Sequence, residues 1–446
     1  MTRRRVLVIA EAANPEWVSV PLVGWSLARA LAQVADVHLV TQIRNREAIL
    51  RTGLVEGQDF TALDSETLAR PLWRLSSLLS GGQGRGWTIQ QALATISYPY
   101  FEHLVWKNFG SAICNGAFDV VHRVTPLSPV QQSPIAAKCR RAGVPFVLGP
   151  INGGVPWPKG FEAEMKQENE WLSRLRGLSR VLPGRRNTLL SNAILAGSHQ
   201  AIRNIPARHQ ERVIYLPENA VDLERFWRQA DHDPARSGGV LRACFIGRLV
   251  PLKGVDMLIA AAEPLLAAGR MELDIIGEGP VLPMLQEQAR HLGSTVRFHG
   301  WKKHEEVQDI AAGCTVLAFP SIREFGGGVV LEAMALGLCP VVIDYAGPAE
   351  LVTPDTGYAV PIGNRSEVVA GLRTALLHCA DNSEEVEQKG LAARARVQAL
   401  FTWKNKAEQV REVYEWVCGA RTDRPNPMSV NNFDLQPRGR CCRTHT

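Results

Sequence analysis

The chain has no long apolar run, no large excess of one charge and, apart from the adjacent Cys441 and Cys442, only scattered cysteines. No stretch reaches the roughly 18 consecutive apolar residues of a transmembrane helix. The apolar run near the N-terminus, Val6 to Ala10, is too short for a signal peptide. The nine cysteines contain no CxxC pair, so we expect buried thiols in a reducing compartment and no zinc or disulfide framework. These absences predict a cytoplasmic protein.

Two nucleotide fingerprints are also missing. No GxGxxG follows the strand predicted at Val6 to Ala10 or the one at Arg242 to Gly247, which disfavours a hydride-transferring dinucleotide enzyme. The GEGP segment that begins at Gly277 lacks the GKS of a P-loop. The net charge of +6 suits a phosphorylated ligand or an anionic membrane surface, and it does not indicate nucleic acid.

The chain does contain strand–helix–strand alternation, once in each half. Val6 to Ala10 and Asp36 to Thr41 flank a helical pattern, and Arg242 to Gly247 and Glu272 to Ile276 flank another. This order predicts an α/β protein with two parallel doubly wound sheets, in which ligands lie beyond the carboxyl ends of the strands. We predict domains over residues 1–218 and 240–400, a linker over 219–239, a helix over 401–418 and a disordered polar tail over 419–446.

The most informative stretch runs from Phe319 to Glu350. An apolar strand ends there, and the glycines Gly326 to Gly328 open a helical pattern. A helix N-terminus behind glycines presents free N–H groups and partial positive charge to an anion. Glu324 and Glu332 lie on either side of the glycines. A phosphate between two hydroxyl-rich groups, as in a nucleotide sugar, would suit this arrangement.

A second loop supplies cations. Arg248 and Lys253 follow the strand at Arg242 to Gly247 and precede a helix. Arginine binds pairs of oxygens and lysine supplies a mobile point charge, so the two residues can clamp a diphosphate.

The first half offers weaker candidates. Glu11 to Val20 follows the first strand, and His122 is predicted at the carboxyl end of a strand over Phe118 to Val124, where it would face the ligand edge. Asn152 and Gly153 can offer backbone donors to a substrate. The alternatives are an ordinary connector, a core histidine and a structural turn.

Two further segments bear on partners. Glu168 to Leu190 places leucines at helical spacing among arginines, which predicts either a basic helix on an anionic bilayer or a helix that packs on the domain with solvated arginines. Asp231 and Asp233 form a lone DxD in the linker, for which we predict solvent exposure and no metal.

The second half resembles family 4 of the retaining glycosyltransferases, whose GT-B fold has two facing Rossmann-like domains. The resemblance covers about Arg242 to Gly363. It rests on Gly247, Arg248, Leu249, Lys253, Gly254, Ile276 to Pro280, Phe298 to Gly300, Pro320, Ser321, Glu324 to Gly326, Leu331 to Ala335, Gly337 and Pro340 to Val342.

The resemblance implies roles for these residues. Arg248 and Lys253 should bind the donor diphosphate and balance charge on the leaving group, and Glu324 should contact sugar hydroxyls as the third catalytic residue. Glu332 should bind the ribose. The remaining donor-binding residues implied are Gly247, Gly277, His299, Phe325, Gly326, Gly327, Gly328 and Leu331.

The resemblance is looser in the first half. Trp17, in the first loop, matches a subset of the family, and His122 matches another family position. With Asn152 and Gly153, these residues form the expected acceptor side. The helix at Thr402 to Val417 fits the family's C-terminal helix, which crosses back to the first domain.

The function implied is a retaining, metal-independent hexosyltransferase that needs no cofactor. It would move a sugar from a nucleotide-diphosphate sugar to a saccharide or lipid-linked acceptor in polysaccharide or glycolipid synthesis, with peripheral contact to the inner face of the plasma membrane. A nucleotide-sugar epimerase or hydrolase of the same fold, or a non-catalytic nucleotide-sugar-binding protein, are the alternatives.

Overall fold

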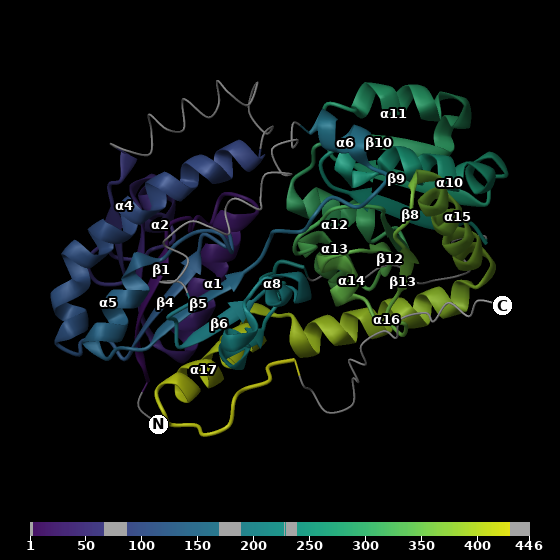
Figure 1. The fold of residues 1–446 in the computed structure, drawn as a ribbon. Helices are drawn as coiled ribbons and strands as arrows, with labels where there is room; N and C mark the ends of the chain where they lie inside the picture. The colour runs from purple at the N-terminus through teal and green to yellow at the C-terminus, as the bar shows by residue number, and fades with distance from the viewer. Residues whose placement is uncertain (1–2, 67–86, 169–188, 227, 229–238, 429–446) are drawn as a thin grey trace, which may run out of the picture.

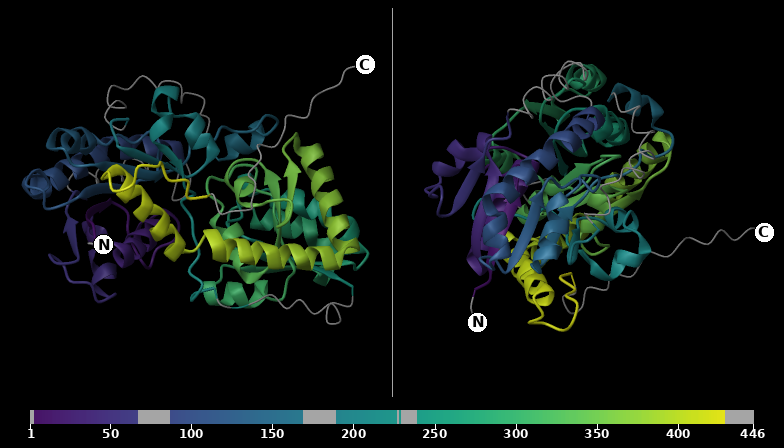
Figure 2. Two further views of the ribbon diagram at one scale, coloured as in Figure 1. Left: turned by 90° about the horizontal axis from the view of Figure 1, so that it is seen from below. Right: turned by 60° about the vertical axis from the view of Figure 1, so that its left-hand side comes forward.

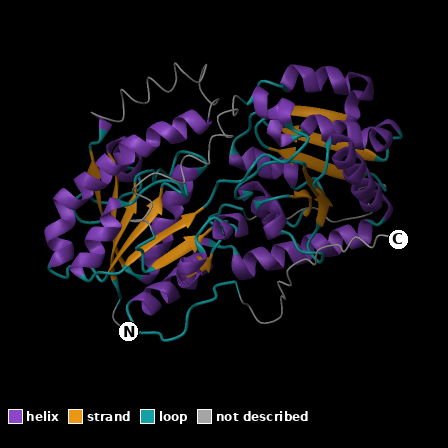
Figure 3. Ribbon diagram, viewed as in Figure 1, coloured by secondary structure: helices purple, strands orange, loops and turns teal. Residues whose placement is uncertain are grey.

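The computed structural model describes residues 3–66, 87–168, 189–226, 228 and 239–428, which form two parallel sheets covered by helices (Figures 1 and 3). The strand order is β3-β2-β1-β4-β5-β6-β7 in the first sheet and β10-β9-β8-β11-β12-β13 in the second. In each sheet the chain first adds strands toward one edge and then returns to the middle and adds the rest toward the other edge. This is the doubly wound topology that the sequence predicted.

The first sheet forms from short apolar runs, and most of their side chains are buried. Its strands are β1 (Arg5–Ala10), β2 (Asp36–Gln42), β3 (Phe60–Leu63), β4 (Val120–Thr125), β5 (Phe146–Ile151), β6 (Ala193–Ala196) and β7 (Val213–Tyr215). The helices of this half are α1 (Val20–Val34), α2 (Arg46–Leu50), α4 (Trp87–Cys114), α5 (Pro134–Ala142), α6 (Glu162–Gln167) and α8 (His199–Arg203), with 3-10 turns η1 (Ile43–Asn45) and η3 (Ala207–Arg212).

The second sheet is also built from short apolar strands connected by helices. Its strands are β8 (Leu241–Ile246), β9 (Met271–Ile276), β10 (Val296–Gly300), β11 (Val316–Phe319), β12 (Cys339–Asp344) and β13 (Tyr358–Pro361). Its helices are α10 (Val255–Ala267), α11 (Leu282–Ala289), α12 (His304–Ala311), α13 (Gly328–Leu336), α14 (Gly347–Leu351), α15 (Arg365–Asp381) and α16 (Ser383–Leu400), with 3-10 turns η4 (Pro251–Lys253) and η5 (Arg290–Thr295).

The last helix, α17 (Trp403–Val417), leaves the second sheet and packs on the first (Figures 1 and 2). Val410, Val413 and Tyr414 of α17 are fully buried in the core that α1 covers. The predicted return of the C-terminal helix is therefore confirmed.

The two chain crossings between the sheets lie side by side. Val221 donates its N–H to the Phe401 carbonyl at 2.7 Å, and Trp403 donates to the Val221 carbonyl at 3.3 Å. We call this paired crossing the hinge.

A segment of the first half also crosses to the second sheet. Phe161, just before α6, has no exposed surface and packs in the core of the second sheet. Arg323 donates to the Val155 carbonyl at 3.1 Å, and the Tyr345 hydroxyl donates to the Pro156 carbonyl at 3.0 Å. The predicted domain boundary at residue 218 did not anticipate this docked arm.

Several predictions concern residues outside the described ranges. They include most of the basic segment Glu168 to Leu190, the pair Asp231 and Asp233, and the tail beyond residue 428. Within the described ranges, no helix has both the length and the apolar character required to cross a bilayer.

Candidate active site

The loops after β8 and β11 meet at the carboxyl edge of the second sheet. β8 pairs with β9 on one side and β11 on the other, so the chain reverses its winding between β8 and β11. This switch point is where ligands bind in open α/β sheets. Arg248 and Lys253 follow β8, and Glu324 and the glycine triplet follow β11.

The glycines of the second loop are required by its geometry. Gly327 has φ 65°, in the left-handed region, and caps the start of α13 at Gly328. A Cβ placed on Gly326 would lie 2.0 Å from Glu218 Oε1 and 2.2 Å from Asn219 Nδ2, so a side chain there would require both of these side chains to move. The Val330 N–H donates to the Gly327 carbonyl at 2.9 Å, and among the described residues the N–H groups of Gly328 and Val329 have no backbone partner, so these two groups can bind an anion.

The three predicted catalytic residues lie on these two loops. Lys253 forms an ion pair with Glu324, and both side chains keep some exposure, 17% and 22%. The Lys253 ammonium also lies 4.9 Å from the centre of the Phe319 ring. Arg248 is exposed, and its guanidinium makes no hydrogen bond or ion pair with any described residue, although its carbonyl accepts from the Val250 N–H at 3.1 Å. The Arg248 guanidinium is therefore available to a diphosphate. Lys253 would have to leave its ion pair with Glu324 in order to bind the same diphosphate.

Glu332 lies one turn inside α13 and is partly exposed. Burial raises the pKa of this carboxyl group to about 7, and the positive charge of Arg225 opposes the rise. Among the described residues, none donates a hydrogen bond to the Glu332 carboxyl group. Its oxygens can therefore accept hydrogen bonds from a ligand.

The other predicted donor-binding residues serve the loops themselves in this structure. A Cβ on Gly277 would lie 1.9 Å from the Gly247 carbonyl, so these glycines allow the loops after β8 and β9 to touch backbone to backbone. His299 Nε2 bonds to Asp274 Oδ1 at 2.6 Å, and the side chain of Leu331 is fully buried in the core. Their contacts with a donor stay predictions.

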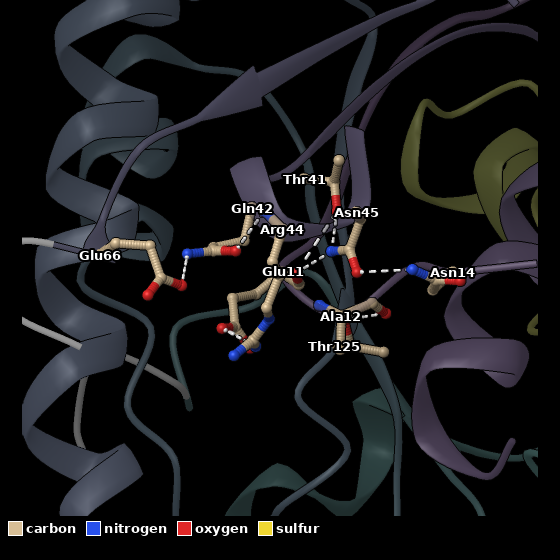
Figure 4. A network of polar contacts seen from close by, with 9 residues as sticks. All are labelled: Glu11, Ala12, Asn14, Thr41, Gln42, Arg44, Asn45, Glu66 and Thr125. Carbon is tan, nitrogen blue, oxygen red and sulfur yellow. Dashed lines mark hydrogen bonds and ion pairs between the residues drawn. The ribbon is translucent and has the colours of Figure 1, made fainter. Parts of the chain in front are cut away.

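On the first sheet, a polar network holds the loop after β1 (Figure 4). Asn45 Nδ2 donates to the Glu11 carbonyl at 2.9 Å, Asn14 Nδ2 donates to Asn45 Oδ1 at 3.4 Å, and Arg44 pairs with the Glu11 carboxylate at 2.6 Å. Trp17 extends from this fixed loop with 44% of its surface exposed. Its contact with an acceptor stays a prediction.

His122 is placed differently from the prediction. β4 continues to Thr125, so His122 lies inside the strand, fully buried, and not at its carboxyl end. Its Nδ1 bonds to the Tyr414 hydroxyl and its Nε2 to the Gly149 carbonyl, each at 2.6 Å. Burial lowers the pKa of this imidazole to about 4. The predicted position was wrong, and the ring connects the sheet to α17.

Asn152 and Gly153 also use their polar groups within the protein. Asn152 Oδ1 accepts from the Gly153 N–H at 2.7 Å and from Ser198 Oγ at 2.8 Å. Asn152 Nδ2 donates to both oxygens of Glu218 at 2.8 Å and to the Phe325 carbonyl at 3.0 Å. The expected backbone donor at Gly153 is therefore already engaged.

Sequence reasoning missed Glu218 as part of this region. It is 4% exposed and follows β7, next to the glycine loop of the other sheet. The available signal was an acidic residue directly after a strand, at the carboxyl edge where the two sheets face each other.

A second carboxylate joins the two halves. Glu350 of α14 accepts from the His199 N–H at 3.0 Å and from the Tyr215 hydroxyl at 3.0 Å. Burial raises the pKa of Glu350 to about 7, and these hydrogen bonds oppose the rise. In the described part of the chain, no group of three acidic, histidine or cysteine side chains is arranged to hold a metal ion.

Comparison with known proteins gives one family and several relatives. Residues 241–378 match the family described as glycosyl transferases group 1. A GDP-mannose-dependent alpha-mannosyltransferase of Mycobacterium tuberculosis is 29% identical over 309 residues, which cover 68% of this chain and 74% of that protein. A GDP-mannose-dependent monoacylated alpha-(1-6)-phosphatidylinositol monomannoside mannosyltransferase of Corynebacterium glutamicum is 29% identical over 237 residues. That match covers 49% of this chain and 57% of the relative's length.

Solved structures share the fold at low identity. A glycosyltransferase from Rickettsia africae has a TM-score of 0.60 at 12% identity, covering 94% of this chain and 99% of that one. A sucrose-phosphate synthase from Thermosynechococcus elongatus has a TM-score of 0.59 at 16% identity, covering 94% of this chain and 100% of that one. Both similarities extend over the two sheets, in agreement with the GT-B fold.

Proposed function

Because residues 241–378 match the glycosyl transferases group 1 family, we propose that the chain moves a mannosyl group from GDP-mannose to a lipid-linked or saccharide acceptor. The observation that carries the proposal is the guanidinium of Arg248, which has no partner among the described residues and lies on the same two loops as the Lys253–Glu324 pair and the α13 terminus. The choice of GDP-mannose follows the names of the two mannosyltransferase relatives.

We propose that the transfer retains the configuration of the sugar. The bond between the anomeric carbon and the diphosphate oxygen breaks, and a bond to the acceptor oxygen forms on the same face. The acceptor proton passes to the departing diphosphate, so the protein needs no general base. Arg248, Lys253 and the N–H groups of α13 stabilise the charge on the leaving group, and Glu324 orients the sugar hydroxyls. Because these side chains supply the charge, the proposal includes no metal ion.

Relative movement of the two sheets about the paired crossing at Val221 and Thr402 would close the site over both substrates. Closure excludes water, which would otherwise hydrolyse the donor. We further propose that the acceptor reaches this site at the inner face of an anionic membrane, with the arginines of the segment over residues 168–190 near the lipid.

The first experiment is a calorimetric titration with GDP, UDP and ADP. We expect GDP to bind most tightly, and no binding of any of the three would contradict the proposal. Incubation with GDP-mannose and phosphatidylinositol vesicles should then yield a mannolipid with the α configuration by NMR, at the same rate with and without EDTA. Free mannose at the full rate without vesicles would indicate a hydrolase.

The membrane part has a separate test. Co-sedimentation with phosphatidylglycerol vesicles should be lost when Arg174, Arg176 and Arg180 are changed to Glu, while sedimentation with phosphatidylcholine vesicles stays low throughout. Unchanged sedimentation of the charge-reversed variant would contradict membrane contact through this segment.

A further inference from the structure

A cluster of buried polar side chains lies where the hinge meets the glycine loop. Glu218, Asn152, Ser198 and Lys406 are each less than 7% exposed. They come from the start of the hinge, the loop after β5, the start of α8 and the returning helix α17. The proposed transfer requires no direct chemistry from any of them.

The cluster contacts the backbone of the donor loop directly. The Asn152 amide is shared between the Glu218 carboxylate, at 2.8 Å to each oxygen, and the Phe325 carbonyl at 3.0 Å. A Cβ on Gly326 would lie only 2.0 Å from Glu218 Oε1 and 2.2 Å from Asn219 Nδ2. The carboxylate and the loop therefore pack without space for a single methyl group.

The same carboxylate is connected to the other chain crossing. The Lys406 ammonium donates to the carbonyl of Pro217, the neighbour of Glu218, and the positive charge of Lys406 acts on Glu218. Burial raises the pKa of Glu218 and lowers the pKa of Lys406 to about 7, while each charge favours the ionised form of the other. A movement at either crossing would therefore alter the contacts that hold the loop.

We propose that Glu218 is a positioning residue, which acts with Asn152 to hold the Phe325–Gly326 backbone in place for sugar transfer when the two sheets are together. Glu218 touches neither substrate in this role. The inference rests on the proposed function for its kinetic consequence, but the contacts that it invokes exist without substrate. A displaced loop would leave the nucleotide contacts of Arg248 intact and misplace the sugar.

The test compares Glu218→Gln and Asn152→Ala with a matched control, Glu102→Gln. Glu102 is also a buried carboxylate, 1% exposed, and accepts hydrogen bonds from Tyr98 and the Ile135 N–H, away from the donor loop. The Gln variant of Glu218 turns an acceptor oxygen into a donor that faces the Asn152 amide, and the Ala variant removes the hydrogen bond from Asn152 to the Phe325 carbonyl. If one of the two variants does not fold, the other alone is sufficient to test the proposal.

Two readouts are measured. Hydrogen–deuterium exchange of the peptide over residues 320–336, without substrate, should be at least about tenfold faster in both variants and unchanged in the control. The kcat for GDP-mannose should fall by about 100-fold, as expected for a displacement of roughly 1 Å, while the Kd for GDP changes less than about threefold. The double variant should lose no more than the larger single loss, because both changes break one contact.

Unchanged exchange in both variants, or additive losses in the double variant, would overturn the proposal. Equal effects in the Glu102→Gln control would also overturn it, since they would show a general response to the loss of a buried charge. If the native chain does not use GDP-mannose, the proposed donor fails, and the exchange experiment still decides the role of Glu218.

Discussion

We predict that nucleotide binding depends on pH through Glu332, which the family resemblance assigns to the ribose. Burial raises this pKa to about 7, so the carboxyl group is about one-tenth ionised at pH 6 and about nine-tenths ionised at pH 8. An ionised carboxylate accepts hydrogen bonds from both ribose hydroxyls, and the protonated acid is a weaker acceptor. If only the ionised form binds, the affinity for GDP should rise by about tenfold over this interval, or about 1.4 kcal/mol.

The effect of pH on folding stability has the opposite sign to its effect on GDP affinity. The pKa of Glu332 is higher in the folded chain than in the unfolded chain, so its contribution to stability is present below the unfolded pKa of about 4.3 and is lost as pH rises through 7. Bound GDP stabilises the ionised form. The increase in melting temperature caused by GDP should therefore be larger at pH 8 than at pH 6.

The assay is calorimetric titration of GDP between pH 6 and pH 8 at constant ionic strength. The GDP phosphate also titrates in this range, so the quantity compared is the ratio of affinities between the native chain and Glu332→Gln. That ratio should increase about tenfold from pH 6 to pH 8. Glu287→Gln, an exposed carboxylate on α11, is the control and should keep a ratio of about 1. A ratio for Glu332→Gln that does not vary with pH would refute the reasoning.

Three other predictions concern single residues. Arg248→Ala should lower GDP affinity by about 1.5–3 kcal/mol through the loss of a charge-assisted pair. The control is Arg270→Ala, which changes another exposed arginine and should leave the affinity unchanged. Equal calorimetric affinities for the two variants would contradict the diphosphate role of Arg248. His122→Gln should flatten the pH dependence of unfolding between pH 6.5 and 4, because the folded imidazole is kept neutral and the native chain loses on the order of 3 kcal/mol on acidification. Urea denaturation at each pH would measure this, and an equally steep loss in the variant would rule it out. Phe161→Ala should destabilise the second sheet by about 3–5 kcal/mol in the same assay, whereas the exposed Met284→Ala should change stability by less than about 0.5 kcal/mol.

The loops after β8 and β11 were predictable from sequence because the signals for them are local. Apolar runs, the glycine triplet and the following helical pattern identify β11, the loop and α13 without knowledge of any distant contact. Likewise, Arg248 and Lys253 follow a strand and precede a helix, so the topology alone brings them to the same edge. The second half therefore followed from periodicity and loop chemistry.

The missed features depend on contacts between distant parts of the chain. Asn152 lies 66 positions from Glu218 and 173 from Phe325, and no local pattern couples them. The position of His122 was misjudged because β4 runs on to Thr125, and its partner Tyr414 is 292 positions away. A tertiary contact, and not the residue type, decides whether such a histidine faces a ligand or the core.

The burial of Phe161 changes what counts as a separable unit of this protein. A fragment that begins after the hinge would contain every strand of the second sheet but would lack the phenylalanine that fills part of its core. Exchange of donor domains between relatives by a cut at the hinge would leave that space empty or filled by a foreign side chain. A chimera with the native specificity and stability therefore requires residues 155–167 to be transferred together with the second sheet, although they precede the hinge in the chain.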